Sequence, residues 1–519
     1  MHRKYLQFLL LFTASLVTFF APAQSAYDIK VNFKGCKDST VYLARYFFDQ
    51  MPITDSCKKI KDGKIEFKGD MPLDAGVYFL ANQTRSSYYC QFIVDKNQKF
   101  SISFDGTAVA STLKSDDKEN TLFFSYIKFM TTKSQELVNF KLAQRGKSKA
   151  DSAKAVAEKQ TAISNEMLAF DEDFRSKNKG TFVADLMTLK ADKNAKTLPL
   201  AANGRPDSVY QYYYYKNHYF DGLNWKDDRM LRTPFFANRL KDYFEHLVPQ
   251  HPDSVIKELD KILMQCEPGS VMFNTLVGHF TYKYELNKSM SFDAMGKSNT
   301  FEKVFIHLAD KYIISGKTDG YYSAETIAKI KERVDILRNL LPGTKVQNLY
   351  MIDTADGAKV LRMGFDTCRS SQSVTHLYNS SIEVLRPLFK PLYNVSAKYT
   401  LLVFWAADCG HCKTEVPKLY EDLKVFDGKV NYAVYAVQTK EEMLAGWKQF
   451  IIDKKLKGWI HVFDPIHLNN LKEQFDINAT PVIYLLDKDK KIIAKKLAPE
   501  QAVEIIQKLE EIEKERNKQ

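Results

Sequence analysis

Two cysteines near the C-terminal end of the chain are spaced for dithiol chemistry. Cys409 and Cys412 enclose Gly410-His411, and the pair directly follows an apolar run that ends at Trp405. If a helix begins at Cys409, its unpaired backbone N–H groups and its dipole favour the thiolate form of that cysteine. His411, when protonated, adds positive charge beside the sulfur. We therefore expect Cys409 to be the nucleophile of a disulfide exchange and Cys412, in the first helical turn, to resolve the mixed disulfide.

The same pair admits other uses. A zinc site needs two further ligands at metal spacing, and neither Cys368 nor His376 in this region belongs to a paired motif. Delivery of Cu(I), which soft thiolates bind well, stays open as an alternative function. A partner-binding protein that uses this region only as a scaffold is the other alternative. We expect no metal site and no cofactor.

The elements that must position the pair alternate between strand and helix. We expect a strand over 400–405, a helix to Phe426, a strand over 432–437, a helix over 441–452, a strand over 482–486 and a closing helix from Pro499. This alternation predicts an α/β sheet over residues 342–519. Upstream, residues 116–341 have helix-forming composition and spacing, and residues 27–115 show short alternating strands. The chain is therefore expected to be multidomain, with a small antiparallel β-sandwich, a central all-α region and a C-terminal α/β domain.

Residues 1–26 are typical of an export signal. His2-Arg3-Lys4 precedes an apolar stretch over 5–20, and small residues follow at 21–26. An uncleaved membrane anchor is the alternative, although the apolar run is shorter than the ~20 residues of a spanning helix. Export permits disulfides, but the sequence leaves the pairing of Cys36, Cys57 and Cys90 open.

The charge balance does not indicate a nucleic-acid-binding protein. Lys plus Arg number 75 against 63 Asp plus Glu, which gives a net charge of +12. The cations alternate with acids along the chain and form no stripe with stacking aromatics. We expect no nucleic-acid partner, and the oligomeric state stays open.

Two separated motifs resemble the thioredoxin superfamily, and more closely its exported TlpA/ResA-like branch. The first motif runs from Phe404 to Pro417 around the cysteine pair, and the second is Ile477-Asn478-Ala479-Thr480-Pro481-Val482. The resemblance covers roughly residues 342–519 and implies a thioredoxin-like fold with a cis-proline at Pro481 that faces the redox pair. It also implies that Glu415 accepts a proton during exchange. The substrate contacts that it implies come from Trp405, His411, Thr480 and Pro481, with the backbone of Thr480 pairing to an extended substrate strand.

This resemblance has implications for partners and location as well. The implied partners are protein thiols and disulfides, together with a membrane electron donor if the chain works as a reductase. The regions over 27–115 and 116–341 resemble β-rich and helical domains of unknown function that precede thioredoxin domains in Bacteroidetes proteins, which implies a Gram-negative periplasm. Val403 and Asp408 depart from the cytoplasmic pattern of a buried aspartate and a tryptophan, and Gly410-His411 resembles protein disulfide isomerase. The direction of electron flow therefore stays open.

Overall fold

The computed structural model describes residues 25–145, 149–195, 197–287, 289–292, 298–440 and 443–518. The predicted signal at 1–26 lies almost wholly outside these ranges. The chain forms two compact units, Met1–Leu247 and Val248–Gln519. Their boundary falls inside the region 116–341, so the predicted helical region is divided between the two units. Within the described ranges, no helix is both long enough and apolar enough to cross a membrane.

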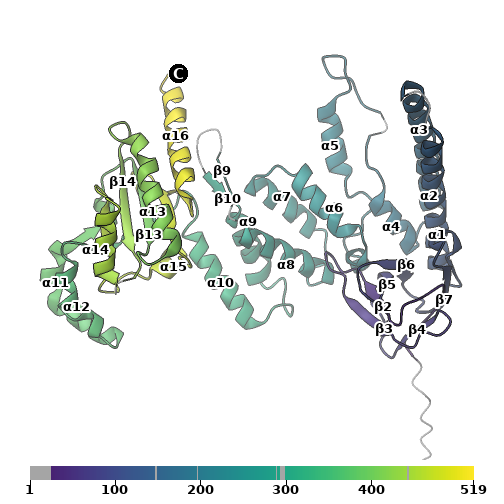
Figure 1. Cartoon of the computed structure of the whole chain (residues 1–519), viewed down its shortest axis with the longest axis horizontal. Helices are drawn as coiled ribbons and strands as arrows, with labels where there is room; N and C mark the ends of the chain where they lie inside the picture. The colour runs from purple at the N-terminus through teal and green to yellow at the C-terminus, as the bar shows by residue number, and fades with distance from the viewer. Residues whose placement is uncertain are drawn as a thin grey trace, which may run out of the picture. The chain divides into compact units, whose positions relative to one another are not determined.

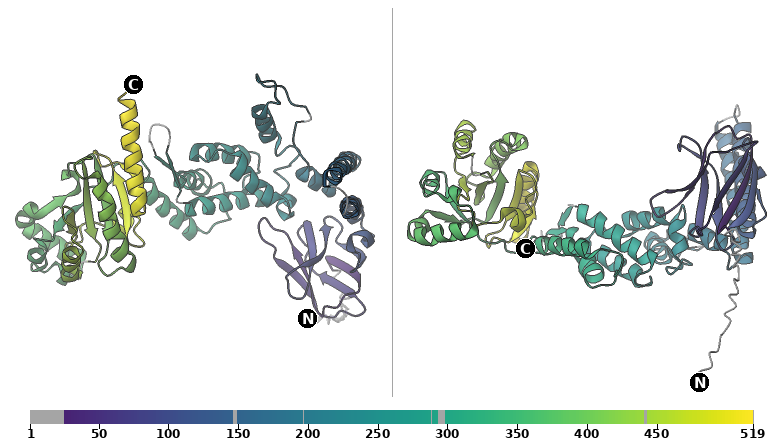
Figure 2. Two further views of the ribbon diagram at one scale, coloured as in Figure 1. Left: turned by 45° about the horizontal axis from the view of Figure 1, so that its top comes forward. Right: turned by 90° about the horizontal axis from the view of Figure 1, so that it is seen from below.

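The first unit begins with a β-sandwich, whose strands are purple in Figure 2. One sheet has the order β4 (Lys64–Gly69), β1 (Tyr27–Lys34), β7 (Lys99–Asp105) and β8 (Lys114–Ser115). The other has the order β3 (Ile53–Cys57), β2 (Val41–Arg45), β5 (Gly76–Ala81) and β6 (Tyr88–Val94). Strand β1 buries Ile29, Val31 and Phe33 and exposes the residues between them, as alternation predicts. The expected antiparallel sandwich is confirmed for the other strand pairs of the two sheets, but β1 pairs parallel to β7.

Helices complete the first unit, and the first of them, α1, lies between β7 and β8 in the chain. They are α1 (Val109–Thr112), α2 (Lys118–Ala143), α3 (Lys149–Lys177), α4 (Phe182–Lys190), α5 (Ser208–His218) and α6 (Phe236–Asp242). Side-chain caps begin several of them, with Asp117 accepting from the Asn120 N–H at α2 and Thr181 from the Ala184 N–H at α4.

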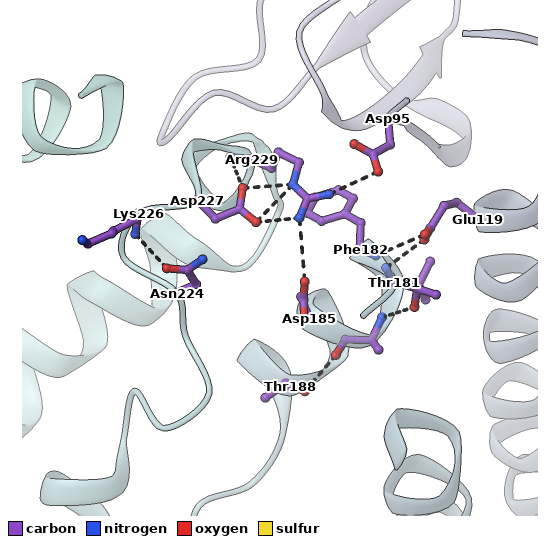
Figure 3. A network of polar contacts seen from close by, with 12 residues as sticks. Asp95, Glu119, Thr181, Phe182, Asp185, Thr188, Asn224, Lys226, Asp227 and Arg229 are labelled. Atoms are coloured by element: carbon purple, nitrogen blue, oxygen red, sulfur yellow. Dashed lines mark hydrogen bonds and ion pairs between the residues drawn. The ribbon is translucent and has the colours of Figure 1, made fainter. Parts of the chain in front are cut away.

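Arg229 joins the helical segments of the first unit to the sandwich (Figure 3). Its guanidinium donates to both carboxylate oxygens of Asp227 and, over 3.1 Å, to Asp95, which directly follows β6. The same group lies 4.5 Å from the ring centroid of Phe182 at the start of α4. The backbone N–H groups of Phe182 and Val183 donate to Glu119 of α2. Sandwich and helices therefore share one polar network.

The second unit opens with helices and continues into a sheet with further helices, the last of which, α16, is yellow in Figure 1. The helices are α7 (Pro252–Leu263), α8 (Val271–Leu286), α9 (Glu302–Leu308) and α10 (Ala324–Arg338), and a short pair of strands, β9 (Met290–Phe292) and β10 (Ser298–Thr300), lies between α8 and α9. The described sheet has the order β12 (Phe389–Pro391), β11 (Tyr350–Asp353), β15 (Ile460–Phe463), β14 (Tyr432–Gln438), β13 (Tyr399–Trp405), β16 (Val482–Leu486) and β17 (Ile492–Lys495). The helices of this part are α11 (Gly357–Leu361), α12 (Ser371–Leu385), α13 (Gly410–Leu423), α14 (Leu444–Asp453), α15 (Leu471–Phe475) and α16 (Pro499–Arg516).

Strand β13 lies in the interior of this sheet and determines where its core forms. It pairs parallel to β14 and antiparallel to β16, and every one of its residues is buried. Leu401, Val403 and Trp405 enter one hydrophobic cluster together with side chains of α13, α14 and α16. Leu402 and Phe404 enter a second cluster with Phe475 of α15 and Leu340 just after α10. The alternating side chains of one buried strand thus serve both faces of the sheet.

Candidate active site

Cys409 lies at the N-cap of α13, four residues after the end of β13. Its backbone is extended, with φ −69° and ψ 127°, and the Lys413 N–H donates to its carbonyl over 3.1 Å. The sulfur therefore lies at the N-terminus of α13, as the sequence predicts, and the backbone N–H groups of His411 and Cys412 hydrogen-bond to it. Cys412 follows within the first turn and has no exposed surface, and the Ala406 N–H donates to its sulfur over 3.5 Å.

The loop before β16 brings Thr480 and Pro481 to the cysteine pair. The Thr480–Pro481 peptide bond is cis, which confirms the expected cis-proline. The Cys409 thiol donates to the Thr480 carbonyl over 3.2 Å. Residues 71 positions apart in the chain thus form one site, because β16 pairs with β13 and carries the loop to the end of that strand.

The two sulfurs have opposite electrostatic surroundings. Burial tends to raise the pKa of Cys409, but hydrogen bonds from the Thr480 side chain, from Cys412 and from the His411 backbone outweigh burial and bring this pKa below its ordinary value of 9.0. For Cys412, burial dominates and raises the pKa to about 12. The Cys409 thiol therefore ionises more readily than an ordinary cysteine thiol, and the Cys412 thiol ionises less readily.

Trp405 does not lie at the surface of the site. Its side chain is 0% exposed and packs in the core, with its ring 5.2 Å from that of Phe450. A side chain without exposed surface cannot contact a substrate, so the expectation of a substrate contact from Trp405 is corrected. As the last residue of the fully buried β13, Trp405 instead fixes the end of the strand from which the cysteine loop departs.

His411 and Glu415 lie together on the outer side of α13. The Nδ1 atom of His411 is 4.0 Å from a Glu415 carboxylate oxygen, and the two residues are one turn apart. The His411 side chain is 85% exposed, so it is available to an approaching partner. The described contacts of Glu415 include no hydrogen bond to either sulfur, and its expected role in proton transfer stays a prediction.

Asp408, the residue before Cys409, forms an ion pair that the sequence did not indicate. The Asp408 Oδ2 atom lies 2.5 Å from the Nζ atom of Lys440, a residue that follows β14. The hydrogen bond from Lys440 lowers the pKa of Asp408 below its ordinary value. An anionic group next to Cys409 is therefore paired with a cation from the neighbouring strand end, as the parallel pairing of β13 and β14 permits.

A second group missed from the sequence holds the start of the cis-proline loop. Arg333 of α10 donates to both carboxylate oxygens of Asp476 over 2.5 and 3.1 Å, and Lys496 also pairs with this carboxylate. Asp476 has a left-handed backbone with φ 49° at the end of α15, and its carboxylate accepts from the Asn478 side chain. Since 143 residues separate Arg333 from Asp476, no local pattern could reveal the pair.

No disulfide links the cysteines of the described residues. Cys36, Cys57, Cys90, Cys266 and Cys368 are all thiols in this structure, as are Cys409 and Cys412. Within the described part of the chain, no three His, Cys, Asp or Glu side chains come together as a metal site would require.

Two segments match known protein families. Residues 390–495 match the AhpC/TSA family, and residues 194–338 match a domain of unknown function, DUF5106. No curated protein matches the chain.

Several solved structures are similar to part of the chain. A domain of a possible thiol-disulfide isomerase from Cytophaga hutchinsonii is 35% identical, covers 34% of this chain and 96% of that chain, and superimposes with a TM-score of 0.25. A thioredoxin-like protein from Bacteroides caccae is 17% identical, with 60% of this chain and 97% of that chain covered and a TM-score of 0.34. A thiol:disulfide interchange protein from Bacteroides sp. is 24% identical, with 32% and 88% covered and a TM-score of 0.23.

Proposed function

Because the C-terminal part of this chain belongs to the AhpC/TSA family of thioredoxin-like proteins, we propose that the chain is an exported thiol-disulfide oxidoreductase acting on protein partners through Cys409 and Cys412. The observation that carries the proposal is the contrast between the two thiols. Cys409 is partly exposed at a helix N-terminus with a lowered pKa, and Cys412 is fully buried with a pKa of about 12. A nucleophile and a resolving thiol require this difference.

The exchange proceeds in two thiol–disulfide steps. The Cys409 thiolate attacks one sulfur of a partner disulfide, forms the mixed disulfide and releases the partner's other sulfur as a thiolate. Cys412 then loses its proton and attacks the Cys409 sulfur, which expels the second partner thiolate. The chain is oxidised to the Cys409–Cys412 disulfide and the partner is reduced to a dithiol; the reverse sequence oxidises a partner. Glu415 remains the proposed acceptor of the Cys412 proton, since it lies on the same helix one turn further on.

The cis-proline loop is the proposed binding surface for the substrate strand. Thr480 places its carbonyl 3.2 Å from the attacking sulfur, so a backbone that pairs beside Thr480 and Pro481 brings its own disulfide to Cys409. The exposed His411 imidazole borders the same approach.

Covalent trapping tests the division of roles. Cys412→Ser should retain partners on Cys409 as mixed disulfides, seen as reducible high-mass bands after incubation with oxidised insulin or an envelope extract. Cys409→Ser should trap none, and Cys368→Ser, which alters another partly exposed thiol of the same unit, should behave like the parent. A Cys412→Ser variant that traps nothing and exchanges as fast as the parent would refute the assignment.

The reduction potential of the Cys409–Cys412 pair decides the direction of electron flow between this chain and its partners. A value near or below ~−250 mV indicates a reductase supplied by a membrane electron donor, and ~−120 to −180 mV indicates an oxidase or isomerase. The absence of a measurable couple, with tight Cu(I) binding in its place, would instead support the metal-delivery function. Recovery of a chain cleaved near residue 26 from the periplasmic fraction tests export.

A further inference from the structure

The outer face of one sheet of the sandwich is hollowed into a groove. It lies across β4, β1, β7 and β8, and its volume is about 1230 Å³. The last two residues of β3 and the loop that leads from β3 to β4 border it. The outward-facing residues of these strands line it, such as Asn32 of β1 and Ser101 and Ser103 of β7. The strands stand ~4.8 Å apart, so the groove spans ~14 Å from β4 to β8. An extended peptide of about four residues covers that distance at ~3.3 Å per residue.

The groove gathers cations that are dispersed in the sequence. Its lining includes six exposed lysines, namely Lys30, Lys58, Lys59, Lys61, Lys64 and Lys114. Three acids, Asp62, Glu66 and Asp116, also line it, so the formal charge of the lining is +3. Within the described residues only Lys30 of these six forms an ion pair, at 3.4 Å from Asp28. The other five ammonium groups are therefore available to an anionic ligand.

The remaining lining residues narrow the class of ligand. Five of them, Asn32, Ser56, Ser101, Ser103 and Ser115, carry amide or hydroxyl groups that can hydrogen-bond to carboxylates or to a peptide backbone, and the other four are the buried Val31, Cys57, Ile65 and Ile102. None of the described lining residues is aromatic. The stacking platforms with which proteins bind single-stranded nucleic acids are therefore missing, and so are the flat faces on which sugar rings pack.

We propose that this groove binds an acidic, extended polypeptide segment of a partner protein. The choice of a polypeptide over another polyanion rests on the proposed function, whose substrates are protein disulfides. Carboxylates of the segment pair with Lys58, Lys59 and Lys64 along the edge of the sheet, and the serine hydroxyls on β7 satisfy its polar groups. A second binding site on the same chain raises the effective concentration of the partner at Cys409.

Binding of a labelled peptide tests the proposal. The probe is a fluorescein-labelled peptide of eight glutamates without cysteine, titrated by anisotropy against the chain from Tyr27 at low salt. The combined variant Lys58→Gln/Lys59→Gln/Lys64→Gln should weaken binding at least tenfold and reduce its salt dependence. The matched control Lys37→Gln/Lys141→Gln/Lys179→Gln removes the same charge from exposed lysines of the same unit outside the groove, and it should bind within twofold of the parent.

Two outcomes would overturn the proposal that this groove binds an acidic peptide segment. One is equal weakening by both triple variants, which would indicate attraction to net charge alone. The other is tighter binding of dextran sulfate than of the peptide with the same dependence on Lys58, Lys59 and Lys64, which would assign the groove to an acidic polysaccharide. Because the probe contains no disulfide, these results do not depend on exchange at Cys409, and insulin reduction by the same variants reports separately on the proposed function.

Discussion

At the scale of single residues, the two thiols of the motif differ chiefly in burial. We predict that iodoacetamide alkylates Cys409 with a rate that rises with pH and levels off below pH 9.0, because its pKa lies below that ordinary thiol value. Cys412 should stay unmodified until the pH approaches 12, since burial keeps it protonated up to that point. Mass spectrometry of the reduced chain after timed alkylation measures both rates.

Variants separate the two thiols in this experiment. Cys409→Ser leaves Cys412 as the remaining thiol of the pair. In this variant the rapid alkylation at position 409 should be lost, and Cys412 should not become rapidly alkylated in its place. Alkylation of Cys412 at pH 7.5 at a rate comparable to Cys409 in the parent would contradict the burial that the roles require.

At the scale of elements, α10 holds the loop that faces the cysteines. Burial would raise the pKa of Asp476, but hydrogen bonds from Arg333 and Lys496 keep it at about 2 instead of the ordinary 3.8. A carboxylate with a depressed pKa stabilises the folded chain above pH ~3.8, and this contribution is lost as the pH falls toward 2. We predict that Arg333→Met lowers the free energy of unfolding by about 1.5–3 kcal/mol at pH 7, with a smaller deficit at low pH, as measured by urea denaturation across pH.

Arg338→Met is the matched control on the same helix. Arg338 pairs with Asp310 with both side chains about half exposed, at 47% and 43%, so its loss should cost less than about 1 kcal/mol. Equal losses for the two variants, or a deficit for Arg333→Met that does not change with pH, would show that Asp476 is not held as described.

At the scale of the whole molecule, the helices over 248–341 belong to the same compact unit as the sheet of β11 to β17 that carries the cysteine pair. Lys495 of β17 forms an ion pair with Glu302 of α9, and these side chains are only 4% and 1% exposed. Removing one partner of a buried pair costs ~3–5 kcal/mol, because the other charge stays buried. We predict that a chain beginning at Pro342 is less stable than one beginning at Val248, as measured by chemical denaturation, because it lacks Glu302 and also Leu340, which packs in a core cluster with Phe404.

Full-length variants isolate the ion pair from the other consequences of truncation. Glu302→Gln should destabilise the chain strongly, and adding Lys495→Met should recover part of the loss, because the unpaired ammonium is then removed. Equal stability of the two truncated chains would contradict the role assigned to this pair. So would a double variant that is less stable than Glu302→Gln alone.

Features decided by local pattern could be predicted from the sequence. The apolar run to Trp405, the cysteine spacing and the helix-forming residues after Cys409 predict that Cys409 lies at a helix N-terminus, because helix starts and buried strands depend on near neighbours. The resemblance of the Ile477–Val482 motif added the cis-proline. The same local reasoning predicted a β-rich, a helical and an α/β region in the correct order.

Contacts between residues that are far apart in the sequence were decided only by the tertiary structure. The parallel pairing of β1 with β7, the complete burial of Trp405 and the position of the unit boundary after Leu247 depend on strand register and packing between elements. The hydrogen bonds from Arg333 to Asp476 also depend on packing between elements. The same is true of the groove across β4, β1, β7 and β8, whose lysines come from separate strands and one loop. Charge and hydropathy along a chain describe each residue's own chemistry, whereas ion pairs, burial and the resulting pKa values depend on which segments the fold places in contact.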